Sequence, residues 1–167
     1  MQGIDTIKRI LSEPVISSGL LVRDLVAARP PATSDGVATL EQRLPRRLSE
    51  FHRQLLLTWN GLDLDVVRFF GASPVRDDGT SLLDAQSLVP AGHPDWVALA
   101  SDPAGFLYVE DEHGVIWSID HDGGEVARAA SSLDEFICSY IFGTRAAEFG
   151  GDSWRDDLVT YGVLPAA

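Results

Sequence analysis

Apolar residues recur at two different spacings along the chain, and the change between them separates helices from strands. Near the N-terminus, Ile4, Ile7 and Leu11 share one helical face, and a second short helical pattern follows between residues 21 and 28. The stretch 29–36 is rich in Pro, Ser, Asp and Gly, which is typical of a loop. The chain is therefore expected to begin with a helical arm and a loop over residues 1–36.

The next segment predicts a long apolar helix face. A short helix is expected over 37–43, and Pro45 then disfavours α geometry at the residue before it and suits the first turn of a new helix. One apolar stripe continues from there at steps of three and four, through Leu44, Leu48, Phe51, Leu55 and Trp59. Trp59 is expected to be the last core residue of this helix. Asn60-Gly61 is expected to end it, with Gly61 in the left-handed conformation.

After Gly61 the period changes to that of strands. Residues 62–67 alternate as one strand, Phe70-Gly71 begins a turn, and 71–94 is irregular with a short helix around 82–88. Four further strands are expected, over 96–102, 106–110, 115–120 and 126–130. The last three are joined by short turns, which indicates an antiparallel meander.

A helix is expected to close the sheet. Ser132 and Glu135 have the spacing of a capping box, and Phe136 begins an apolar face that continues to residue 141. A weaker helix is expected over 152–159, and Trp154, in this polar tail, is expected either to be exposed or to anchor a contact. This order of elements predicts an α+β domain with a single antiparallel β-sheet of roughly four to six strands flanked by helices.

Charge narrows the classes of partner. The 167-residue chain, a length that favours one domain, has 25 acidic and 13 basic residues, for a net charge of −12. Such a chain repels nucleic-acid phosphate and anionic membranes and attracts a basic protein. A single cysteine, Cys138, and the lack of a signal-like or membrane-spanning apolar run predict a soluble, cytoplasmic protein.

No motif in the chain predicts catalysis. The four histidines lack metalloprotease spacing, no serine lies in a nucleophile elbow, and no phosphate-binding glycine loop occurs, so no catalytic residue, metal or cofactor is expected. One cluster leaves an enzyme as an alternative, because a hairpin would bring together the acids and histidines around His113 and His121. These residues are Asp111, His113, Asp120, His121 and Asp122.

Three segments, in order, resemble the SUKH superfamily, the Smi/Knr-like proteins. They are an entry with Glu41, Leu44 and Pro45 into a helix that ends in Asn-Gly; the aromatic-Gly pair at Gly71; and a strand pair followed by a Ser132, Glu135, Phe136 helix. The resemblance divides the chain into 1–36, a SUKH-like α+β domain over 37–143, and an acidic extension over 144–167. It implies one antiparallel sheet with flanking helices and no shared catalytic residue.

The resemblance also implies a role in binding. Many bacterial members look like immunity proteins that neutralise a cognate polymorphic toxin, often a nuclease or deaminase. Eukaryotic relatives are regulators or scaffolds, which leaves a module without any toxin as the alternative. An acidic inhibitor fits a basic toxin, so exposed acids on loops and sheet edges are the expected contact residues. They are Asp63, Asp65, Asp77, Asp78, Glu110, Asp111, Glu112 and Asp122.

Overall fold

A computed structural model of the chain describes residues 2–12, 26–73 and 81–165 and is built on one sheet. Its seven strands follow each other in sequence order, and every neighbouring pair is antiparallel. They are β1 (Ala27–Ala28), β2 (Leu62–Leu64), β3 (Val67–Phe69), β4 (Val97–Ser101), β5 (Phe106–Glu110), β6 (Ile116–Asp120) and β7 (Val126–Ala130). The α+β class and the single antiparallel sheet are confirmed, with more strands than expected.

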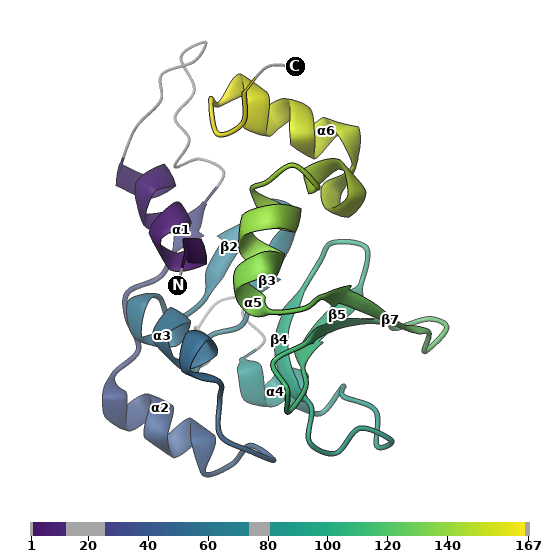
Figure 1. Cartoon of the computed structure of the whole chain (residues 1–167). Coiled ribbons are helices and arrows are strands. Elements are labelled where there is room, and N and C mark those ends of the chain that lie inside the picture. The colour runs from purple at the N-terminus through teal and green to yellow at the C-terminus, as the bar shows by residue number, and fades with distance from the viewer. Residues whose placement is uncertain (1, 13–25, 74–80, 166–167) are drawn as a thin grey trace.

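The helices surround this sheet (Figure 1). They are α1 (Gln2–Ser12), α2 (Ser34–Glu41), α3 (Glu50–Thr58), α4 (Leu82–Gln86), α5 (Leu133–Glu135), the π-helix η2 (Phe136–Ile141) and α6 (Ala146–Thr160). None of the helices in the described part of the chain is long and apolar enough to cross a membrane.

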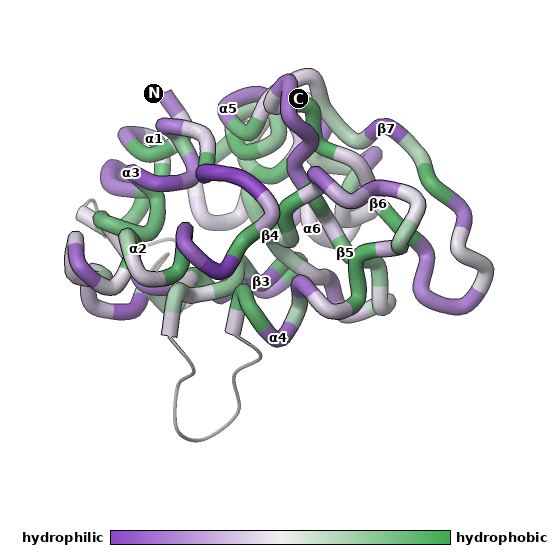
Figure 2. Tube along the Cα trace, turned by 90° about the horizontal axis from the view of Figure 1, so that it is seen from below, coloured by the Kyte–Doolittle hydropathy of each residue, from purple (hydrophilic) through white to green (hydrophobic). Residues whose placement is uncertain are grey.

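A hydrophobic core lies on each face of the sheet. Along β5, Tyr108 joins a core with α1, η2 and α6, whereas Leu107 and Val109 join a second core with α2 and α4. Successive side chains of a strand point to opposite faces, so the two cores lie on the two sides of the sheet. Helix α3 contributes Leu55 to the first core and Leu56 to the second. Figure 2 shows hydrophilic residues along the outer turns and hydrophobic stretches in strands such as β4 and β5.

The extra strands come from two short segments that the sequence pattern misjudged. The expected strand over 62–67 is two strands, because a tight turn at Asp65 and Val66 reverses the chain after three residues. Residues 27–28, expected to end a helix, pair instead with β2 as β1. Residues 13–25 lie outside the described part of the chain.

Helix α3 starts later than expected. Pro45 lies in the turn before it, and Ser49 is the N-cap, accepting a hydrogen bond from the His52 amide. Because Ser49 caps the helix, α3 begins at Glu50 and Pro45 lies in the connection before it. The prediction that Pro45 lies in the first turn of this helix was therefore wrong. Leu44 and Leu48 are nevertheless buried, because the connection packs its apolar residues into the second core.

The Asn-Gly and aromatic-Gly pairs form one junction. Gly61 has φ +104°, the positive φ expected of it, two residues beyond the cap at Trp59. The Asn60 side chain accepts a hydrogen bond from the Ala72 amide at 2.7 Å. A Cβ at Gly71 would lie 2.5 Å from the Asn60 carbonyl oxygen, so only glycine fits there. The junction fixes where β2 leaves α3.

The closing helices depart from expectation at two residues. The Ser132 hydroxyl caps the Glu135 amide as expected, but the Glu135 carboxylate accepts from the Ser131 amide, so the reciprocal capping box is absent. Trp154 is 2% exposed and its Nε1 donates to the Ile141 carbonyl at 2.7 Å, so its predicted exposure was wrong. Helix α6 folds back and carries Trp154 into the first core.

Candidate partner-binding surface

Three turns lie together at one end of the sheet. In an antiparallel meander, the turns after β2, β4 and β6 fall at the same end of the strands. The β4–β5 and β6–β7 turns touch, because a Cβ added at Gly105 would lie 2.5 Å from the His121 ring. We name this end the acidic turn edge, after its carboxylates. They are Asp65, Asp102, Asp120, Asp122 and Glu125.

Three of these carboxylates face solvent. Asp65 is exposed in the β2–β3 turn at φ +24°, a region that Asp tolerates better than most residues. Asp122 and Glu125 are exposed in the β6–β7 turn, and Asp122 lies 3.1 Å from His121 Nε2.

The other two acids of the edge hold the turns. Asp102 accepts hydrogen bonds from the Phe106 amide and the Tyr108 hydroxyl, both at 2.9 Å. Burial and the neighbouring Asp102 together raise the pKa of Tyr108. Asp120 accepts from the Asp122 amide at 2.9 Å. These bonds hold the β4–β5 turn and the β6–β7 turn, which displays Asp122 and Glu125.

Asp63 is half-buried and has a cation beside it. It pairs across β2 and β3 with Arg68, whose guanidinium lies 2.7 Å from the carboxylate. This pair reduces the charge that Asp63 offers to a partner. Asp77 and Asp78 lie outside the described residues.

The β5–β6 turn lies at the opposite end of the sheet and contradicts two of the predicted contacts. Glu110 and Asp111 are 1% and 6% exposed, so neither belongs to an exposed acidic surface. The Asp111 carboxylate accepts from the amides of His113 and Val115 and from Trp117 Nε1, at 2.8 to 2.9 Å. Burial alone would raise the pKa of Asp111, but Trp117 and these amides outweigh it and lower the pKa. Glu112 remains exposed beside them.

Glu110 lies in a buried charge network. Arg46 donates to the backbone carbonyls of Glu110 and Asp111, and its guanidinium is 3.5 Å from the Glu110 carboxylate. His52 Nδ1 lies 3.7 Å from that carboxylate, too long for a hydrogen bond, and has no hydrogen-bond partner among the residues that the structure describes. Burial would raise the pKa of Glu110, but His52, Ser49 and Arg46 lower it overall.

The two histidines of the enzyme hypothesis lie far apart. His113 follows β5 and His121 follows β6, so the five residues of β6, about 16 Å of strand, separate their turns. The expectation that a hairpin brings them together was wrong, because the two residues belong to turns at opposite ends of the strands.

One group of possible metal ligands exists among the described residues. Side-chain atoms of Asp120, His121 and Asp122 lie within 4.8 Å of one another. Asp120 already accepts the Asp122 amide, and both His121 and Asp122 are exposed. Exposed acidic groups commonly occur without an ion, so this geometry carries no metal assignment.

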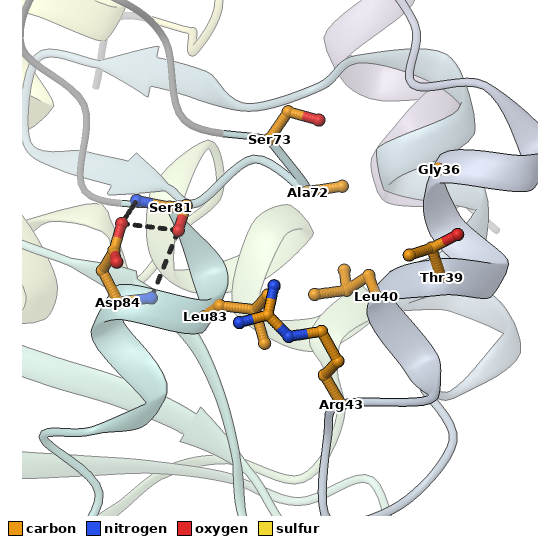
Figure 3. A pocket seen from close by; sticks show the side chains of 9 residues that line it. All are labelled: Gly36, Thr39, Leu40, Arg43, Ala72, Ser73, Ser81, Leu83 and Asp84. Carbon is orange, nitrogen blue, oxygen red and sulfur yellow. Dashed lines mark hydrogen bonds between the residues drawn. The ribbon is translucent and has the colours of Figure 1, made fainter.

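A pocket of about 400 Å³ lies between α2, the end of β3 and α4 (Figure 3). Arg43 reaches into it, with Leu40 and Leu83 nearby. The Asp84 carboxylate is occupied in a capping box with Ser81, which lowers the pKa of Asp84. None of the described residues that line the pocket is a histidine, so the serines in it have no histidine base beside them.

The sequence pattern did not predict the exposed Glu125 of the acidic turn edge, nor that Arg46 and His52 lie beside Glu110. Glu125 ends an Asp-Gly-Gly turn, and its position before a strand could have marked it as exposed. Nothing local marks Arg46 or His52, because their partner Glu110 lies 64 and 58 positions further along.

A family model described as SMI1 / KNR4 family (SUKH-1) matches residues 31–139, which is more than half of the chain. No curated protein matches it.

Proposed function

The chain belongs to the SMI1/KNR4 family (SUKH-1), and on that premise we propose that it is a non-enzymatic immunity protein. It binds a basic toxin domain of the nuclease or deaminase type and blocks it without turnover. The observation that carries the proposal is the acidic turn edge, where Asp65, Asp122 and Glu125 face solvent at one end of the sheet.

Electrostatic complementarity supports this role. A nuclease needs a positively charged cleft for phosphate, and an acidic surface can occupy that cleft in place of the substrate. The net charge of −12 accelerates the encounter with such a cleft at low ionic strength. Exposed acids also lie elsewhere, for example Asp35 and Asp95, so the experiment must separate the edge from the overall charge.

The test pairs the protein with a toxin encoded beside its gene. Coexpression is expected to restore growth of cells that produce the toxin, and the purified proteins are expected to form a stable complex. Association should slow steeply as salt rises, because salt screens the steering. Death of the coexpressing cells together with no complex would refute the immunity role. Capture of host proteins instead would support the regulatory or scaffold alternative.

Two triple variants locate the surface. The edge variant, Asp65→Asn with Asp122→Asn and Glu125→Gln, removes three negative charges from the acidic turn edge. The matched control, Asp35→Asn with Asp95→Asn and Glu112→Gln, removes three from exposed sites on other segments. The edge variant is expected to slow association about tenfold more than the control. Equal rates for the two variants would place the contact elsewhere.

A further inference from the structure

Strand β7 forms an open edge of the sheet. It is the last strand in the sheet order, and its hairpin stands at the side of the molecule in Figure 1. The Asp120 amide donates to the Glu125 carbonyl, so by alternation the pairs of Ile119 with Val126 and Trp117 with Arg128 are not hydrogen-bonded. The backbone N–H and C=O groups of Val126 and Arg128 therefore point away from β6.

A groove runs beside this edge. Two cavities of about 480 and 320 Å³ share four lining residues, which are Arg128, Ala129, Tyr140 and Arg145. They are therefore parts of one depression that extends from β7 over β6 and β5 and is bounded by η2 and the start of α6. The larger cavity is also lined by aromatic rings, with Phe149 5.7 Å from Tyr108 and 5.3 Å from Phe136 between centroids.

The far wall of the groove is already ordered. The Arg145 guanidinium lies 4.1 Å above the Tyr140 ring and donates to the Glu148 carboxylate at 2.9 Å. A wall that is held in this way loses little conformational freedom when a ligand binds.

We propose that the β7 edge and this groove bind an extended segment of a partner protein by strand addition, with a carboxylate side chain opposite Arg128. The outward groups of Val126 and Arg128 hydrogen-bond the added strand. Alternate side chains of that strand enter the groove, as in other complexes where a strand extends a sheet. The site is defined without the toxin, so it does not rest on the function proposed above.

Charge favours a foreign segment over a second copy of this chain. Arg128 is the central residue of β7, so a symmetric antiparallel pairing of two β7 strands would set two arginines opposite each other. Two copies with a net charge of −12 each would also repel one another. Within the described residues, Arg128 forms no salt bridge. The carboxylate that interacts with it electrostatically is Glu135, which lines the same cavity and already accepts a hydrogen bond from the Ser131 amide, so the exposed Arg128 guanidinium can still pair with an acidic side chain on the added strand.

The first experiment uses three blocked seven-residue peptides with alternating Thr and Val and a central Glu, Gln or Lys. Amide NMR of the full chain is expected to show shifts and slowed hydrogen exchange at Val126 and Arg128. The Glu peptide should bind about three- to tenfold more tightly than the Lys peptide, as cross-strand charge pairs allow.

Two variants at Arg128 separate the contribution of its backbone hydrogen bond to peptide binding from the contribution of its charge. Arg128→Pro removes an N–H that faces away from β6, and edge strands tolerate a proline at such a position. This variant is expected to bind the Glu peptide more than tenfold more weakly than wild type. Arg128→Thr keeps the N–H and should bind the Glu and Lys peptides equally. If Arg128→Pro does not fold, Val126→Pro removes the other outward N–H.

The proposal fails if none of the peptides changes the amides of Val126 and Arg128 in the wild-type protein. It also fails if a folded proline variant binds as tightly as wild type. If Arg128→Thr forms dimers while wild type binds no peptide, Arg128 only guards the edge against pairing, and the proposal is wrong.

Discussion

The β5–β6 and β6–β7 turns are both rich in acids, yet the structure uses them in opposite ways. "EDEHG" at 110–114 places two carboxylates inside the molecule, where they hold the turn against Arg46 and Trp117. "DHDGGE" at 120–125 exposes Asp122 and Glu125 to solvent. The comparison shows that an acidic turn can be a structural lock or a contact surface, and that its partners from distant segments decide which.

The largest effect is expected where Glu110 is removed. Glu110→Ala should lower the free energy of unfolding by about 3 kcal/mol, because it leaves the Arg46 guanidinium and the buried His52 ring without the carboxylate that lies beside them. Urea denaturation followed by far-UV circular dichroism measures the change. A loss below about 1 kcal/mol would mean that the network adds little to stability and that the two turns differ less than the burial indicates.

Removal of Asp111, the second buried acid, should lower the free energy of unfolding somewhat less. Asp111→Ala is expected to lose about 2 kcal/mol, since three donors, including Trp117 Nε1, lose their acceptor. Glu112→Ala, one residue further in the same turn, is the matched control and should stay within about 0.5 kcal/mol of wild type. Trp117 fluorescence should change in the first variant alone.

Acid should weaken the β5–β6 turn, because it protonates Glu110. The folded-state pKa of Glu110 lies below its ordinary value of 4.5, so its contribution is present above that value and is lost as pH falls through the depressed pKa. The free energy of unfolding should therefore fall with acidification below about pH 4.5, and Glu110→Gln should show a shallower fall. If the free energy of unfolding falls equally steeply with pH in the two proteins, protonation of Glu110 does not cause the loss of stability in acid.

The smallest effect is expected at the exposed turn. Asp122→Ala and Glu125→Ala should each change the free energy of unfolding by less than about 0.5 kcal/mol, because both side chains face solvent. Thermal unfolding beside the Glu110 variant checks this. A loss as large as that of Glu110→Ala would make the β6–β7 turn a structural lock as well and break the comparison.

Local patterns predicted the second half of the sheet, β4 to β7, well. The spans of these strands and the Ser132 cap follow from alternation, turn residues and a hydroxyl at the right spacing. The first half, β1 to β3, was predicted less well. Leu62, Leu64 and Val66 alternate as one strand would, although Val66 lies in the tight turn that reverses the chain. Trp154 shows the same difficulty, because a polar neighbourhood in sequence conceals a residue that α6 carries into the core.

The sequence by itself determined the fold class, the family and the acidic character of the chain, because these depend on periodicity, motif order and composition. Only the tertiary structure decided which acids face solvent. Glu110 is buried because Arg46 and His52, far away in the chain, fold onto its carboxylate, and a buried charge persists only with such partners. The acidic turn edge exists for a similar reason, since only strand pairing brings the β2–β3, β4–β5 and β6–β7 turns to one end.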